Sequence, residues 1–195
     1  MDSERVRFHV DSQQGSSRGP SSNGPRGLLG RSLRINVVID GLIIREVAHG
    51  SPAYWATVAL RDSVLRRPLG LQFSVEQLRA EEDSRHIACY RDDTLVGCLI
   101  LRPIAGGDVQ MRQVAVVAQL QGQGIGRAMV EYSEALARTI GFTRIILHAR
   151  ETAVPFYENL GYAKVGERFL ELTIPHWAME RSLTSQSPTL KGERR

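Results

Sequence analysis

The spacing of hydrophobic positions changes repeatedly between residues 35 and 183, and each change indicates a new element. Apolar runs that are continuous or alternate with polar residues predict strands, because successive side chains of a strand face opposite ways. Two turn-forming residues, Asp92 and Asp93, divide one of these runs, so we expect a β-hairpin there. The predicted strand regions are residues 35–50, 85–103, 108–118, 142–150, 164–174 and 177–183.

The stretches between these runs carry helix signals. Ser51 followed by Pro52 predicts a helix start, since serine caps exposed backbone N–H groups and proline suits the first helical position. Ser74 and Gln77 have the spacing of a capping box, which predicts a second, short helix. Both helices precede the hairpin in the chain.

The longest helix is predicted to start near residue 124 and to end at Gly141. It lies between two predicted strands, and a short helix over residues 153–161 follows the second of them. Antiparallel strands followed by a strand, helix, strand crossover predict the α/β class. The apolar face of the long helix comprises Ile125, Met129, Tyr132, Leu136 and Ile140.

The ends of the chain differ in composition from its centre. Residues 1–34 are rich in serine and glycine and lack hydrophobic periodicity, and residues 184–195 resemble them, so we expect both segments to be disordered. The full chain has 195 residues, of which 42% are hydrophobic, enough for one domain with its own core. We place that domain at residues 35–183.

The excess positive charge behind the net charge of +4 is also located at the two ends of the chain. Residues 1–34 contain six arginines and three acidic residues, and residues 182–195 contain three basic residues and one acidic residue. The remaining 16 basic and 17 acidic residues leave the domain without positive excess. A nucleic-acid partner is therefore not expected.

The two cysteines, Cys89 and Cys98, lie on neighbouring predicted strands. Their spacing is not that of metal ligands, so we expect both to pack in the core and no metal to bind. The sequence contains no apolar run of membrane length and no secretory leader pattern. We accordingly expect no membrane association and a cytoplasmic location.

The most informative stretch is "QLQGQGIGRAM", residues 119–129, between a predicted strand and the long helix. A dinucleotide fingerprint would need glycine where Arg127 stands, and a P-loop would need lysine and a hydroxyl residue that are missing. Bare amides at a helix start nevertheless favour an anion such as a pyrophosphate. In the alternative interpretation, the glycines only let the helix pack closely on the sheet.

Together, "QVAVVAQLQGQGIGRAM" and the later "FYENLGY" resemble the GNAT superfamily of acetyl-CoA-dependent N-acetyltransferases. The signature of that superfamily is Q/R-x-x-G-x-G/A after a strand, with an F-Y-x-x-L-G-F/Y box some thirty residues later. Both motifs occur here in that order, and the resemblance covers about residues 35–181. It implies the GNAT acyl-CoA N-acyltransferase fold, a mixed, mostly antiparallel sheet with splayed central strands flanked by helices.

The resemblance also implies that acetyl-CoA is the acetyl donor. The pantetheine arm would pair with the backbone of Val114, Ala115 and Val116. The residues implied for the pyrophosphate are Gln121, Gly122, Gln123, Gly124, Ile125, Gly126 and Arg127.

In this family an amine attacks the thioester directly, while a backbone N–H stabilises the oxyanion and an acid protonates the departing thiolate. Tyr157 matches the family tyrosine that often acts as this acid, although a tyrosine in a Phe-Tyr pair is also often a half-buried packing residue. The general base stays open among His148, Glu171, His176 and water.

The expected acceptor is a primary amine of a small molecule or peptide. In this family the first two helices flank the acceptor, and here they carry aromatic and basic residues that select no particular amine. An alternative function is a non-catalytic acetyl-CoA sensor, and a homodimer is also left open. The residues concerned are Tyr54, Trp55, Arg61, Arg66 and Arg67.

Overall fold

A computed structural model describes residues 7–10 and 35–184 of the chain. Within these ranges a nine-stranded sheet runs in the order β1-β2-β3-β4-β5-β6-β7-β9-β8. Its strands are β1 (Arg7–Val10), β2 (Ile35–Ile39), β3 (Leu42–Val47), β4 (Arg85–Arg91), β5 (Thr94–Ile104), β6 (Asp108–Val116), β7 (Arg144–Arg150), β8 (Ala163–Glu171) and β9 (Ile174–Ser182).

The α-helices are α1 (Pro52–Arg61), α2 (Val75–Arg79), α3 (Ile125–Ile140) and α4 (Val154–Glu158). A π-helical turn, η1 (Asp62–Arg66), continues α1. The 3-10 turns are η2 (Arg67–Leu69), η3 (Ala105–Gly107), η4 (Ala118–Leu120) and η5 (Glu151–Ala153).

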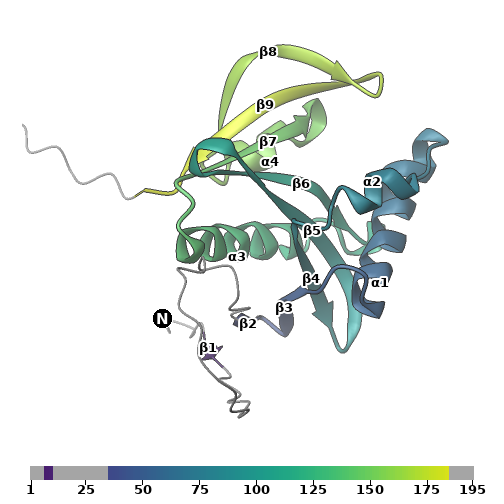
Figure 1. Cartoon of the computed structure of the whole chain (residues 1–195), viewed down its shortest axis with the longest axis vertical. Helices are drawn as coiled ribbons and strands as arrows, with labels where there is room; N and C mark the ends of the chain where they lie inside the picture. The colour runs from purple at the N-terminus through teal and green to yellow at the C-terminus, as the bar shows by residue number, and fades with distance from the viewer. Residues whose placement is uncertain (1–6, 11–34, 185–195) are drawn as a thin grey trace, which may run out of the picture.

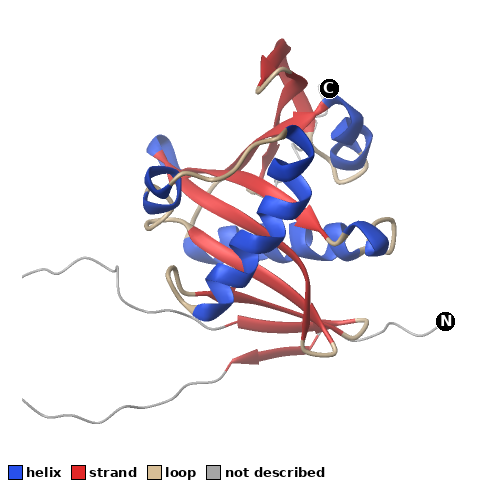
Figure 2. Cartoon of the chain, turned by 90° about the vertical axis from the view of Figure 1, so that its right-hand side faces the viewer, coloured by secondary structure: helices blue, strands red, loops and turns tan. Residues whose placement is uncertain are grey.

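Helices cover both faces of the central strands (Figures 1 and 2). On β5, Cys98 faces α1, with its Sγ 3.7 Å from the Thr57 carbonyl. Its neighbour Gly97 faces α3 and packs directly under Met129. Because adjacent residues of a strand point to opposite faces, α1 and α3 lie on opposite sides of the sheet. The two buried cysteines are free, as expected of packing residues.

Strand pairing confirms the predicted α/β class and the mixed sheet. The β6–β7 pair is parallel, as a β6–α3–β7 crossover requires, and the other neighbouring pairs are antiparallel. β6 pairs with β7 from Asp108 to Met111 and no further. The rest of β6 diverges from β7, which is the predicted splay.

A β-bulge lies where the splay begins. In the β5–β6 register Ile100 faces Arg112 but Cys98 faces Ala115, so β6 carries one extra residue between these pairs. Gln113 within the bulge has a φ of 53°. The extra residue bends β6 away from β7, because a bulge turns its strand locally.

Local sequence signals for the helices are confirmed. The Ser51 hydroxyl accepts a hydrogen bond from the Tyr54 N–H at 3.1 Å, and Ser74 with Gln77 forms the predicted capping box. Gly141 ends α3 in the left-handed conformation. The predicted apolar face of α3 is wrong at Ile140, which is 38% exposed. This side chain belongs to the last helical residue, where α3 leaves the sheet for the turn to β7.

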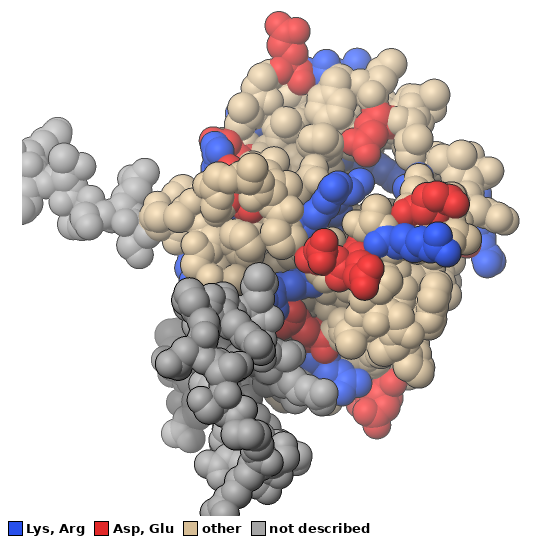
Figure 3. Space-filling view, in the orientation of Figure 1, with Lys and Arg blue, Asp and Glu red and all other residues tan. Residues whose placement is uncertain are grey.

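Strand β1 lies inside the segment for which the sequence predicts disorder, and it pairs with β2 in antiparallel fashion. Residues 1–6, 11–34 and 185–195 lie outside the described residues, so the remainder of that prediction and the C-terminal one fall there. On the face seen in Figure 3, acidic and basic side chains are interspersed.

Candidate active site

The glycine-rich loop between β6 and α3 uses its glycines in two ways. Gly122 and Gly124 adopt left-handed φ angles of 79° and 81°, and a Cβ on either would meet open space. These two positions therefore need glycine for backbone conformation. Gly126 differs, because its Cβ would lie 3.4 Å from the ring of Phe156. The close-packing interpretation therefore holds for Gly126, while the other two glycines shape an open turn.

The start of α3 presents unused donors. The first N–H to bond within the helix belongs to Ala128, which donates to the Gly124 carbonyl at 3.0 Å. No side chain of a described residue caps this end. The N–H groups of residues 125–127 therefore lack helical acceptors, and they lie at the positive end of the helix dipole. Such an end can bind an anion.

Two side-chain contacts surround this loop. Arg127 forms an exposed ion pair with Glu131 one turn later, at 3.3 Å, which offsets its unfavourable place near the helix start. Arg91, at the end of β4, donates to the Gln123 amide oxygen at 3.0 Å. Sequence reasoning missed Arg91, because 32 residues separate it from Gln123 and no local motif connects them.

Beyond the splay, β6 has an open edge. The Val117 N–H donates to the Val96 carbonyl of β5 at 2.9 Å. Because hydrogen-bonded positions alternate along an antiparallel pair, Ala115 also bonds toward β5, and Val114 and Val116 point their backbone groups toward β7. β7 does not pair with them. The Gln121 side chain donates to the Val116 carbonyl at 3.2 Å, which ties the glycine-rich loop to this edge.

Tyr157 lies in α4 with 7% of its surface exposed, packed against Phe156 and Tyr162. Burial raises the pKa of its phenol to about 12, so the hydroxyl stays protonated near neutral pH. The Tyr157 hydroxyl makes no hydrogen bond with another described residue. Tyr157 can therefore donate a proton to a molecule bound beside it.

Of the three protein groups considered as general base, the two histidines contact the ring of Phe169, and Glu171 contacts one of these histidines. His148 Nδ1 is 2.9 Å from Glu171 Oε2, and both side chains are partly exposed. Phe169 meets the His148 ring edge-on and stacks with the His176 ring. His176 Nδ1 is 2.8 Å from the Ile174 carbonyl, so this ring nitrogen donates. The fold thus brings together residues that the sequence offered separately.

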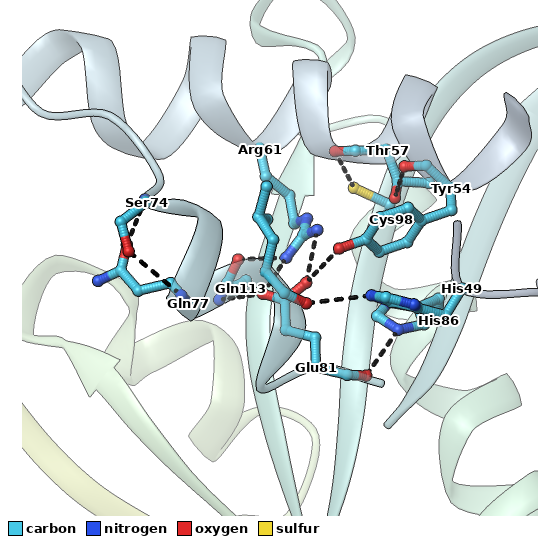
Figure 4. A network of polar contacts seen from close by, with 11 residues as sticks. His49, Tyr54, Thr57, Arg61, Ser74, Gln77, Glu81, His86, Cys98 and Gln113 are labelled. Carbon is cyan, nitrogen blue, oxygen red and sulfur yellow. Dashed lines mark hydrogen bonds and ion pairs between the residues drawn. The ribbon is translucent and has the colours of Figure 1, made fainter. Parts of the chain in front are cut away.

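A buried polar network connects α1 to β6 (Figure 4). Arg61 is fully buried and donates to both Glu81 oxygens, at 2.8 and 3.0 Å. Tyr54 donates to Glu81 Oε2 at 3.1 Å, and Gln113 donates to Glu81 Oε1 at 3.2 Å. Gln113 also accepts a hydrogen bond from Arg61. Arg61, one of the arginines predicted near the acceptor, is therefore paired within the protein and is not free to contact an acceptor.

Two more residues predicted for the acceptor side point elsewhere. Arg67 is exposed and pairs with Asp62 at 2.8 Å. Trp55 is 52% exposed, and its indole donates to the Gly50 carbonyl at 3.1 Å. Arg66 stacks on Phe73, with its guanidinium carbon 4.6 Å from the ring centroid.

His86 belongs to the same buried region and makes stability depend on pH. Burial lowers its pKa to about 4, and its Nε2 donates to the Glu81 carbonyl at 3.1 Å. Its Nδ1 has no hydrogen-bond partner among the described residues. The unfolded chain binds more protons than the folded one between pH 6.5 and 4, so stability falls as the pH is lowered. We expect the titration of His86 to lower the free energy of unfolding by about 1–2 kcal/mol when the pH falls from 7 to 5. Urea unfolding at the two pH values measures this difference.

The control for this effect is His86→Gln, which cannot titrate. Its unfolding free energy should change less between pH 7 and 5 than that of the wild type. Equal pH dependence in the two proteins would contradict the assignment.

Among the described residues, no group of three or more histidine, cysteine or acidic side chains could hold a metal ion. In the same part of the chain, the helices are all too short or too polar to cross a membrane.

Comparison with known proteins adds to this geometry. A family model described as an acetyltransferase (GNAT) domain matches residues 69–183, more than half of the chain. The chain is also 29% identical over 121 residues to YjcF of Bacillus subtilis, an uncharacterised N-acetyltransferase. That match covers 62% of this chain and 86% of the relative.

Solved structures share the fold. An acyl-CoA N-acyltransferase from Pseudomonas aeruginosa superposes with a TM-score of 0.63 at 24% identity, covering 72% of this chain and 99% of that one. A GNAT family acetyltransferase from Elizabethkingia anophelis with acetyl-CoA bound gives a TM-score of 0.58 at 15% identity, covering 74% and 99%. At these identities the likeness concerns the fold.

Proposed function

The chain belongs to the GNAT acetyltransferase family, and from this premise we propose that it transfers an acetyl group from acetyl-CoA to a primary amine of a small molecule or peptide. One observation carries the proposal. The unused donors at the start of α3 and the open edge of β6 are adjacent, and the Gln121 side chain ties them together. An extended donor with an anionic centre fits this arrangement.

Each part of the donor has a candidate partner. The amides of residues 122–127 would hold the pyrophosphate, with Gln121 opening the loop. Val114 and Val116 would pair with the pantetheine arm, because their backbone groups point to the unpaired side of β6. Ala115 would support the arm indirectly, since its backbone bonds toward β5. A protein of the same fold from Elizabethkingia anophelis has acetyl-CoA bound, which supports acetyl-CoA as the donor.

The proposed reaction is a direct transfer. The amine nitrogen attacks the thioester carbonyl, a C–N bond forms, and the C–S bond breaks. A backbone N–H on the open edge near Val116 would stabilise the negative oxygen. Tyr157 would give its proton to the departing thiolate, and a base would take the proton of the amine.

Replacing Tyr157 by phenylalanine is expected to lower kcat about 100-fold while leaving the Kd for acetyl-CoA within a factor of three, because only proton donation is lost. Steady-state kinetics and calorimetric titration separate the two effects. Tyr90→Phe removes a phenol elsewhere and serves as control. An unchanged kcat would remove Tyr157 from the mechanism.

For the base we propose His148, held by Glu171. His148 lies on β7 just past its last pair with β6, beside the gap between the splayed strands. His148→Gln should lower kcat at least tenfold, and Glu171→Gln less, because the carboxylate only orients the ring. If His148→Gln retained full activity while His176→Gln lost it, the base would be His176.

The proposed function itself is tested by incubating the protein with acetyl-CoA and a panel of primary amines. Release of free CoA and formation of N-acetyl products, detected by mass spectrometry, are expected for at least one amine class. Tight acetyl-CoA binding without transfer to any amine would instead identify a non-catalytic acetyl-CoA sensor.

A further inference from the structure

A pocket opens on the side of the sheet that α1 and α2 cover, beside the bulge at Gln113. Its cavity volume is about 130 Å³. This is smaller than a site for a whole drug-sized ligand, but it has room for a small group such as a carboxylate or a phosphate. Three arginines line it, Arg66 from η1, Arg102 from β5 and Arg112 from β6.

In the part of the chain that the structure describes, these arginines have no partner of opposite charge. Among the described residues, none of the three lies within ion-pair distance of a carboxylate. Arg66 instead stacks on Phe73, which also lines the pocket. Stacking orients the guanidinium while leaving its N–H groups at the edge of the plane, where they can bind an oxyanion.

Two of the arginines are forced together by the sheet. The register pairs Ile100 with Arg112 and Arg102 with Gln110. Arg102 and Arg112 are therefore diagonal neighbours on one face, with Cα atoms on the order of 7–8 Å apart and Cβ atoms somewhat closer. Like charges at such positions repel each other, and an anion between them would relieve the repulsion.

The one carboxylate in the pocket wall cannot neutralise them. Both oxygens of Glu81 already accept hydrogen bonds from Arg61, and Tyr54 and Gln113 donate to it as well. The buried Arg61 balances its charge. The pocket therefore keeps the positive charge of the other three arginines.

The pocket is close to the proposed chemistry but away from the proposed pyrophosphate site. Arg112 is two residues before Val114, whose backbone points to the gap between β6 and β7. Val116 and the glycine-rich loop lie farther along, roughly 13 Å or more from Arg112 at about 3.3 Å per residue. The arginines are thus placed for the acceptor rather than for the phosphates of the donor.

We propose that this pocket binds an oxyanion group of the acceptor, a carboxylate or a phosphate, so that the preferred substrates are amines carrying a negative charge. This inference rests on the proposed function and narrows its substrate class. Arg102 and Arg112 act as specificity residues, and Arg66 completes the site.

The test compares amines that differ only in the anionic group. Lysine with cadaverine and tyrosine with tyramine test a carboxylate, and phosphoethanolamine with ethanolamine tests a phosphate. We expect kcat/KM to be at least tenfold higher for the anionic amine, either in the carboxylate pairs or in the phosphate pair. The pair that shows the difference identifies the oxyanion that the pocket binds. In Arg102→Gln/Arg112→Gln that preference should fall at least tenfold, mainly through KM. Arg79→Gln, on α2 but outside the pocket lining, should keep it.

Equal or better use of the uncharged amines, or a preference that survives in the double variant, would overturn the inference. If no amine of the panel is acetylated, the proposed function fails, and calorimetric titration of lysine and phosphoethanolamine decides the inference alone. Binding that is at least tenfold weaker in the double variant supports the pocket, and no binding of either compound refutes it.

Discussion

Replacing Gly124 by glutamate is expected to raise the Kd for acetyl-CoA at least 100-fold above that of Gly124→Gln. Both variants force a side chain into the left-handed conformation at φ 81°, so they share the same backbone strain. They differ in one negative charge beside the proposed pyrophosphate site. Two unit charges about 5 Å apart repel by about 3 kcal/mol at an effective dielectric constant near 20, which corresponds to about 100-fold in Kd.

Calorimetric titration of acetyl-CoA measures the difference, and thermal unfolding shows whether both variants remain equally folded. S-acetylpantetheine, which lacks the pyrophosphate, should bind the two variants alike. Equal Kd values for acetyl-CoA in the two variants would place the pyrophosphate elsewhere.

Removing the carboxylate of Glu81 should destabilise the protein by about 3–5 kcal/mol, because Arg61 would keep a buried charge without a counterion. Glu81→Ala is the variant, and urea unfolding gives the free energy. Glu151→Ala is a matched control, since it breaks an arginine pair that is about half exposed, at a cost of up to about 1 kcal/mol.

The double variant Arg61→Met/Glu81→Leu separates charge from packing. It removes both charges together and should recover much of the lost stability. A loss in Glu81→Ala no larger than in Glu151→Ala would mean that Arg61 reaches water when its partner is gone.

The elements could be predicted from the sequence because their signals are local. Ser51, Ser74 and Gly141 each act on backbone groups within a few residues, and periodicity needs only neighbouring positions. Ile140 shows the limit of that reasoning. Its spacing fits the apolar face, but exposure depends on how far the sheet extends under the helix end.

The candidate site was predictable in its parts and not in its contacts. Glycine spacing indicated the loop, whereas the positive φ angles that separate Gly122 and Gly124 from Gly126 required coordinates. The sequence offered His148 and Glu171 as separate candidates for the base. Their contact is made across the sheet between residues 23 positions apart, so no local pattern indicates it. Charged side chains in particular find partners that depend on strand register.

The dependence of charged side chains on distant partners also explains why two arginines of α1 and η1 have different environments. In sequence, Arg61 and Arg66 are equivalent basic residues on one predicted helix. Folding buries Arg61 against Glu81 and leaves Arg66 at the pocket. No pattern of spacing distinguishes them, since the distinction comes from Glu81, which lies 20 residues away from Arg61.

Gln113 occupies the bulge that opens β6, and its side chain bonds to both Arg61 and Glu81. For protein engineering this makes α1, the segment after α2 and β6 one module. If α1 and α2 were replaced by the helices of a relative, the residues at positions 61, 81 and 113 would have to be exchanged together. Otherwise the gap between β6 and β7 would change shape. Variant libraries for new amine substrates should therefore vary the pocket arginines and leave Arg61, Glu81 and Gln113 unchanged.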